Sequence, residues 1–122
     1  MKIIVLIPVY NDWKSVFKLL DEINDLPIEN EFQLSVLIVN DASNFDRQEI
    51  EKSFENINSI KILNMEKNLG HTRCIATGLK YIFEKDQFDY VIPMDGDGED
   101  RPEEIKDFLE KIKVSNGKPI VV

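Results

Sequence analysis

The sequence predicts an α/β fold in which helices cover both faces of a mainly parallel β-sheet. Short apolar runs rich in Ile and Val alternate along the chain with longer segments of helical periodicity. The runs are apolar at nearly every position, which is typical of strands covered on both faces. Strict alternation of strand and helix favours parallel strands joined by right-handed crossovers. With 122 residues, the chain has room for one domain around one core, residues 1–122.

The elements follow one another in a regular order. The predicted strands are Ile3–Ile7, Leu34–Val39, Ile60–Leu63, Tyr90–Pro93 and Ile120–Val122. The predicted helices are Trp13–Leu26, Asp46–Glu55, Thr72–Glu84 and Pro102–Lys113. Helical spacing of the apolar residues supports these boundaries, as with Val16, Leu20 and Ile23 in the first helix.

Capping signals support the last helix and its end. Asp100 followed by Glu103 resembles a capping box, and Pro102 suits the first turn of a helix. Asn116 and Gly117 mark the stop after this helix. The sequence then ends inside an apparent strand, so we expect a domain truncated before a further half.

Composition limits the classes of function. The net charge of −8 argues against non-specific nucleic-acid binding, which needs a basic surface. Cys74 is the one cysteine, so no disulfide forms within the chain, and its helical apolar context predicts packing rather than nucleophilic chemistry. The apolar N-terminal run is cut off by Pro8 and predicts a buried strand, not a signal peptide. No apolar stretch is long enough to cross a bilayer, so we expect a soluble chain without a membrane segment.

Polar residues collect where the predicted strands end. They lie in the segments Pro8–Asp12, Asn40–Ser43, Asn68–His71 and Asp95–Glu99. Ligands of open parallel sheets bind beyond the carboxyl ends of the strands. The sequence therefore predicts a binding site at this edge of the sheet.

The acidic run after the fourth strand predicts a cation site. Carboxylates at this density suit Mg²⁺ or Mn²⁺, completed by phosphate oxygens and water. An EF-hand loop counted from Asp95 fails, because Asp100 stands at the glycine position and Lys106 at the closing glutamate position. An acidic helix-capping loop is the alternative. It explains Asp100 but not Asp95 and Asp97, which directly follow a buried strand.

Residues after the first two strands are candidates for binding a nucleoside, and each has a structural alternative. Tyr10 can stack on a base or pack against the first helix. Asp12 can hydrogen-bond the nucleoside or cap that helix. Asp41 can accept a hydrogen bond from a base N–H or a ribose hydroxyl, or it can cap the following helix.

The third loop is a candidate for binding phosphate. Asn68–Gly70 reads as a turn into a helix whose N-terminus can face a diphosphate. Arg73 would then lie near the anion, or else be a solvated helix charge. His71 would lie there too, but it has no Ser or Cys partner and is a weak candidate for catalysis.

The sequence lacks the motifs of other nucleotide-binding and phosphate-binding protein families. There is no GxGxxG after the first strand and no GxxxxGK[ST] anywhere. A receiver domain needs an aspartate after strand three, which ends at Asn64. A nucleotidyltransferase needs a Gly-rich basic loop after strand one, where this chain has Val9–Asp12.

Motifs in order along the chain resemble the family 2 glycosyltransferases. Ile7–Asp12 is similar to the opening "IPVYNE", and Val39–Ser43 is similar to "VDDGS", with Asn40 and Ala42 as departures. Asn68–Leu79 resembles "N-x-G…R-x-G-L". The DxD motif and the "PPE" after it are matched by Asp95–Asp97 and Arg101–Glu104. The resemblance covers nearly the whole chain and implies a Rossmann-like GT-A fold that binds a nucleotide sugar.

The run from Met94 to Ile105 is closest to the polyprenyl-phosphate branch of dolichyl- and undecaprenyl-phosphate sugar transferases. The metal ligands that the resemblance implies are Asp95, Asp97 and Glu99, the last at a position where the branch often has Gln. The nucleotide-sugar-binding residues expected from sequence and resemblance together are Pro8, Tyr10, Asp12, Asp41, Gly70, Arg73 and Asp95.

The resemblance implies transfer of a sugar from a UDP- or GDP-sugar to an acceptor, either a polyprenyl phosphate or a cell-envelope glycan. Mg²⁺ or Mn²⁺ would stabilise the diphosphate leaving group. The family places the catalytic base, the acceptor groups and any membrane attachment in a C-terminal half, so we expect this fragment to be inactive or weakly active. A catalytically incomplete nucleotide-binding module or regulatory remnant of this fold is the alternative. The implied location is cytoplasmic, at the cytoplasmic membrane face for the full-length protein.

Overall fold

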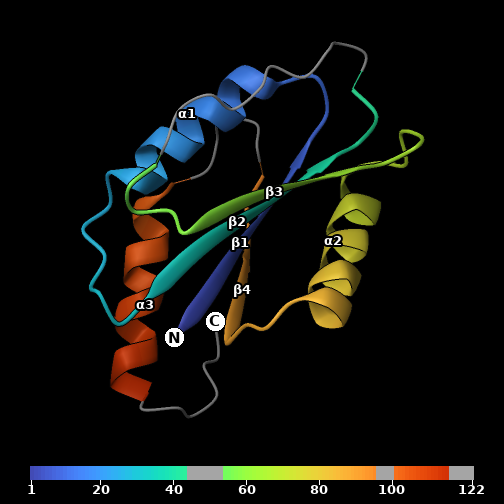
Figure 1. Ribbon diagram of the computed structural model, residues 1–122. Coiled ribbons are helices and arrows are strands. Elements are labelled where there is room, and N and C mark those ends of the chain that lie inside the picture. Colours follow the sequence, from blue (N-terminus) through green and yellow to red (C-terminus); the bar gives the residue numbers. More distant parts are fainter. Residues whose placement is uncertain (44–53, 96–100, 116–122) are drawn as a thin grey trace.

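The computed structural model describes residues 1–43, 54–95 and 101–115 and forms a sheet with helices on both faces (Figure 1). The strands are β1 (Lys2–Val9), β2 (Gln33–Asn40), β3 (Ser59–Asn64) and β4 (Tyr90–Pro93). The helices are α1 (Trp13–Asn24), α2 (His71–Lys85) and α3 (Glu103–Ser115). No helix among these residues is long and apolar enough to span a membrane.

These elements confirm the predicted strands and helices of the described ranges, with ends that differ by at most two residues. The helix predicted at Asp46–Glu55 falls largely outside the described residues, and its last two positions, Phe54 and Glu55, are not helical. The strand predicted at Ile120–Val122 and the helix stop at Asn116–Gly117 also lie outside them.

The sheet confirms the predicted fold class, because all its strands are parallel in the order β3-β2-β1-β4. Lys2 to Val9 of β1 pair residue by residue with Gln33 to Asn40 of β2. β1 and β2 are buried almost throughout, as expected of strands covered on both faces. β3 and β4 are only partly buried, since each is at an edge of the described sheet and has one neighbouring strand.

Two apolar layers hold the helices against the sheet. On one face, α1 and α3 pack on alternate residues of the central strands, such as Ile3 and Val5. On the other face, α2 packs on Leu6 through Cys74 and Ile82, so the predicted packing role of the cysteine is confirmed. Gly78 lets α2 approach closely, because a Cβ at this position would lie 2.5 Å from Leu6 Cδ1.

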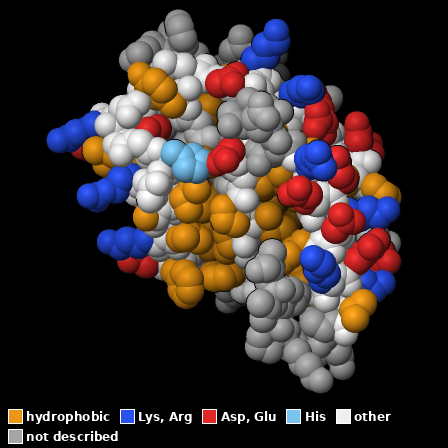
Figure 2. Space-filling model, turned by 180° about the vertical axis from the view of Figure 1, so that it is seen from behind, with side chains coloured by type: hydrophobic (Ala, Val, Ile, Leu, Met, Phe, Trp, Pro, Cys, Tyr) orange, Lys and Arg blue, Asp and Glu red, His pale blue; other side chains and the backbone are white. Residues whose placement is uncertain are grey.

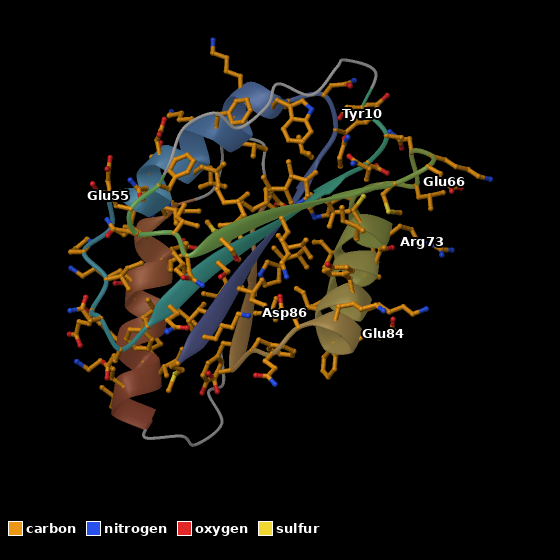
Figure 3. All side chains as sticks on the ribbon, viewed as in Figure 1. Tyr10, Glu55, Glu66, Arg73, Glu84 and Asp86 are labelled. Atoms are coloured by element: carbon orange, nitrogen blue, oxygen red, sulfur yellow. The ribbon has the colours of Figure 1, made fainter. Side chains whose placement is uncertain are left out.

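An ion-pair cluster ties the end of α2 to the sheet. Asp86, which follows α2, lies 2.6 Å from Lys2 Nζ and 3.3 Å from Lys61 Nζ (Figure 3). The hydrogen bond from Lys2 is the largest of the influences that hold the pKa of Asp86 below its usual value of 3.8. The ionised form of Asp86 is therefore the one that the fold stabilises.

We expect Asp86→Asn to lower the free energy of unfolding at pH 7. A carboxyl whose pKa is lower in the folded state stabilises the fold at pH values above its unfolded-state pKa. This contribution is lost as the pH falls through its folded-state pKa. The difference between wild type and variant should therefore shrink below about pH 4. Urea denaturation at pH 7 and at about pH 2.5 checks this. Asp107→Asn, on the exposed surface of α3, is the control. A difference for Asp86→Asn that persists unchanged at the lower pH would contradict the ion-pair explanation.

Candidate functional site

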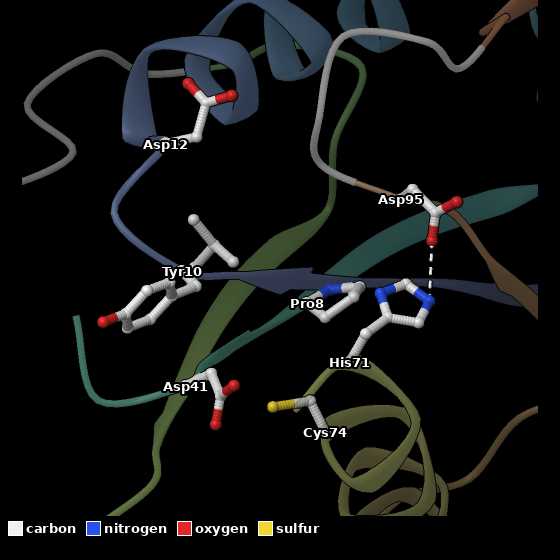
Figure 4. Close-up of a pocket in the computed structure, with 8 residues that line it drawn as sticks. Pro8, Tyr10, Asp12, Asp41, His71, Cys74 and Asp95 are labelled. Atoms are coloured by element: carbon white, nitrogen blue, oxygen red, sulfur yellow. Dashed lines mark ion pairs between the residues drawn. The ribbon is translucent and has the colours of Figure 1, made fainter. Parts of the chain in front are cut away.

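A pocket of about 340 Å³ lies at the carboxyl ends of the parallel strands, where the sequence predicts it (Figure 4). Its lining comes from the ends of β1, β2 and β4 and from the first turn of α2. The lining residues are Pro8, Val9, Tyr10, Asp12, Asp41, His71, Cys74 and Asp95. The fold thus brings together five of the predicted binding residues, namely Pro8, Tyr10, Asp12, Asp41 and Asp95.

The loop after β1 places an aromatic ring and a helix cap beside the pocket. Tyr10 is 44% exposed, so much of its ring surface is accessible to a ligand. Asp12 caps α1, because its Oδ1 accepts a hydrogen bond from Ser15 N at 3.2 Å. Asp12 therefore has the structural role that the sequence left open, and it also lines the pocket.

Asp41 is a buried carboxylate that holds the loop leading into α2. Only 4% of the residue is exposed. Its Oδ1 accepts a hydrogen bond from Leu69 N at 2.8 Å and its Oδ2 accepts one from Gly70 N at 3.0 Å. This role was not among the sequence predictions, which considered a ligand contact or a cap of the helix after β2.

The first turn of α2 carries a histidine to the pocket. Gly70 precedes the helix with a φ of 94°, a left-handed conformation that favours glycine. His71 begins the helix, and its Nε2 lies 2.8 Å from Asp95 Oδ1. From the sequence, His71 is a weak candidate for catalysis, and no sequence pattern pairs it with Asp95.

Cys74 lies one turn further along α2 and faces Asp41. Burial is the main reason that the pKa of its thiol is raised to about 12, and hydrogen bonding to Asp41 raises it further. The thiol therefore stays protonated at neutral pH, whereas nucleophilic chemistry requires the thiolate. The pocket-lining cysteine is a packing residue and a partner of Asp41.

A hydrogen-bond network centred on Asn40 connects the ends of three strands. Asn40 Nδ2 donates to Asn64 Oδ1 at 3.0 Å, and Asn40 Oδ1 accepts from Ser43 Oγ at 2.6 Å. Ser43 Oγ in turn accepts from Asn11 N at 2.9 Å. An amide suits this position because it donates and accepts at once, which a carboxylate does not. In the sequence, the signal for this network is Asn40, which stands where the motif "VDDGS" has its first aspartate.

The other departure, Ala42, adopts a φ of 54°. The left-handed region is costly for residues with a Cβ, so glycine is the residue that fits this backbone best. The loop after β2 therefore keeps a conformation suited to glycine although the chain has alanine there.

Other predicted site residues do not line the pocket or fall outside the described residues. Arg73 is exposed on α2 and points away from the sheet in Figure 3, and it does not line the pocket. Gly70 contributes its N–H to Asp41 but is not part of the lining. Asp97 and Glu99 lie outside the described residues. Within the described ranges, no three metal-ligating side chains come together.

Comparison with known sequences gives a family and distant relatives. The model of the family "Glycosyl transferase family 2" matches residues 4–118. An uncharacterized protein of Methanocaldococcus jannaschii, MJ0544, is 27% identical over 93% of this chain and 48% of its own length. The uncharacterized glycosyltransferase YkcC of Bacillus subtilis is 27% identical over 89% of this chain and 33% of its own length. The chain therefore spans less than half the length of these relatives.

Solved structures share the fold. TarS 1-349 of S. aureus superposes with a TM-score of 0.73 at 24% identity, covering all of this chain and 39% of TarS 1-349. Its complex with UDP-GlcNAc gives a TM-score of 0.72 at 24% identity, and a further structure holds UDP. The likeness confirms the Rossmann-like GT-A fold.

We expect Asp41→Ala to lower the free energy of unfolding by about 2–4 kcal/mol, because it leaves two backbone N–H groups without their charged acceptor. Chemical denaturation measures the change. Asp107→Ala, an exposed aspartate of α3, is the matched control and should change stability by less than about 0.5 kcal/mol. Equal stability of the two variants would contradict a structural role for the Asp41 carboxylate.

Ala42→Gly should raise the free energy of unfolding by about 0.5–1 kcal/mol, since glycine relieves the left-handed backbone at some cost in chain entropy. The same substitution at Ala76, exposed on α2, should lower it by about 1 kcal/mol. Thermal and urea unfolding of the two variants measure these changes in the free energy of unfolding, which should have opposite signs. A loss of stability in both would mean that the backbone at Ala42 is not strained.

Proposed function

The chain belongs to glycosyl transferase family 2, and on this premise we propose that its pocket binds a nucleoside diphosphate sugar as the donor for glycosyl transfer. One observation carries the proposal. The pocket lies at the carboxyl ends of the parallel strands, and its lining combines an exposed aromatic ring with carboxylates from separate loops. This combination provides a surface for a base and hydrogen-bond acceptors for a nucleoside.

In this proposal, the base lies against Tyr10 and between the carboxylates of Asp12 and Asp41. The exposed ring of Tyr10 offers a stacking surface. Each carboxylate oxygen has more than one lone pair, so Asp41 can accept a further hydrogen bond while it holds Leu69 and Gly70. The same carboxylate then fixes the pocket wall and recognises an N–H of the base.

A divalent cation would bind at the other side of the pocket, on Asp95. The Asp95 side chain is 52% exposed and lines the pocket, so its oxygens are accessible to Mg²⁺ or Mn²⁺. A cation of this kind is typically held by one or two carboxylates together with phosphate oxygens. We propose Asp97 and Glu99 as the further protein ligands. The bound cation would offset the negative charge that develops on the diphosphate leaving group.

The donor is proposed to be a UDP-sugar. TarS, which shares the fold, is known in complex with UDP-GlcNAc and with UDP. The acceptor is proposed to be a polyprenyl phosphate, on the basis of the sequence pattern from Met94 to Ile105. Because the chain spans less than half the length of MJ0544 and YkcC, we propose that it binds the donor and transfers the sugar weakly by itself. A nucleotide-binding module without transfer remains the second candidate, and donor turnover separates the two.

Calorimetric titration with UDP and GDP, each with and without Mn²⁺, tests the proposed donor site. We expect Mn²⁺ to tighten UDP binding by about tenfold or more, because Asp95 would hold a cation that offsets the negative charge of the diphosphate. Asp95→Asn should remove most of this gain, because an amide is a poorer metal ligand than a carboxylate.

Asp107→Asn, which lies outside the pocket, is the matched control and should keep the gain. Binding of UDP that is indifferent to Mn²⁺ would remove the cation from the proposal. No binding of either nucleotide by the folded chain would overturn the donor site itself.

A further inference from the structure

We propose that the His71 imidazole positions the Asp95 carboxylate for binding a divalent cation, an assignment that rests on the proposed function. His71 Nε2 lies 2.8 Å from Asp95 Oδ1, and the dashed line in Figure 4 marks this contact. No other residue of this chain supplies an imidazole. Figure 2 shows the imidazole beside a carboxylate on the molecular surface.

Asp95 gains from such a partner because, among the residues that the structure describes, His71 is the side chain paired with its carboxylate. It follows the buried Met94 at the end of β4, but its own side chain is 52% exposed. An exposed aspartate samples several rotamers, and ordering it on binding costs free energy. A contact through Oδ1 restricts the carboxylate to the pocket side and leaves Oδ2 for a cation. Outer partners of this kind typically change metal affinity by about 10–100-fold.

His71 can act in this way because its own backbone is anchored. The carboxylate of Asp41 binds the N–H groups of Leu69 and Gly70, directly before the helix. Cys74 N then donates to Gly70 O at 3.1 Å in the first turn of α2. The imidazole therefore extends from a point fixed to the end of β2 toward the end of β4. In Figure 4 it lies beside Pro8 of β1, which is between those two strands in the sheet.

The geometry of α2 allows His71, and not Arg73 in the same turn, to reach Asp95. Residues two apart on a helix point to different sides, so Arg73 cannot share the direction of His71. Arg73 is exposed and points away from the sheet in Figure 3. The position of His71 at the first residue of α2 is thus what brings a ring nitrogen to Asp95.

The test compares His71→Ala, His71→Asn and His71→Gln in the full chain at one fixed pH. The glutamine amide nitrogen reaches about the position of Nε2, whereas the asparagine amide is too short. Electron paramagnetic resonance of free Mn²⁺ measures binding of the metal alone, and calorimetry measures UDP binding with and without Mn²⁺. Thr72→Ala, at the exposed neighbouring position of α2, is the matched control.

We expect His71→Ala and His71→Asn to weaken Mn²⁺ binding by about tenfold or more, and His71→Gln to stay within about threefold of wild type. In His71→Ala and His71→Asn, UDP affinity without metal should fall less than Mn²⁺ affinity does. A loss of pocket structure would instead weaken the binding of UDP and of Mn²⁺ to a similar extent.

Mn²⁺ binding by His71→Ala that equals or exceeds that of wild type would overturn the inference, since His71 would then be neutral or a competitor for Asp95. Equal weakening by Gln and Ala would overturn it as well. If wild type binds Mn²⁺ but not UDP, the proposed donor site fails while the metal titration still decides the role of His71. If wild type binds no Mn²⁺, the cation site and the role of His71 both fail.

Discussion

The buried carboxylate of Asp41 connects two parts of the chain that the sequence separates by nearly thirty positions. It lies directly after β2 and accepts hydrogen bonds from the two backbone N–H groups that precede α2. A buried carboxylate is stable only when its oxygens have donors, and the amides before a helix need acceptors. Each group therefore satisfies the other. The place of α2 on the sheet, and with it His71 and Cys74 in the pocket, follows from this pair.

The rest of the pocket depends on loops that follow parallel strands at one edge of the sheet. β1 and β2 pair over their whole lengths, so the turns after Val9 and Asn40 begin side by side. The Asn40 side chain then connects these turns to the end of β3 through Asn64 and Ser43. The floor of the site is thus held by backbone pairing, and its rim is held by side-chain hydrogen bonds.

The sequence predicted the fold well because its signals are local and repeated. Apolar runs and helical spacing depend only on residues close together in the sequence. The central strands are covered on both faces and are therefore apolar at nearly every position, which makes them easy to recognise. The pocket location followed as well, since strand ends in a parallel sheet meet at one edge. Five predicted binding residues, Pro8, Tyr10, Asp12, Asp41 and Asp95, line that pocket.

The individual roles of polar residues were harder to predict. Asp41 was expected to meet a ligand or cap a helix, but its partners come from a loop distant in sequence, and no pattern specifies such a contact. For Arg73 the sequence left a phosphate contact and a solvated helix charge open, because the direction of a side chain depends on where the helix begins. The pairing of His71 with Asp95 likewise depends on how α2 is placed across the end of β1.

The position of α3 restricts how a further strand can join the outer edge of β4, because strand–helix–strand crossovers have a preferred handedness. α3 packs on the same face of the sheet as α1, and among the described residues no strand pairs with the outer edge of β4. A parallel strand that came straight from α3 to this edge would complete a left-handed crossover, which occurs in only about 2% of such connections. Chirality therefore favours an antiparallel neighbour for β4, or one that arrives by a longer route. The outer edge of β4, next to Asp95, is therefore where we expect the strand direction of the sheet to change.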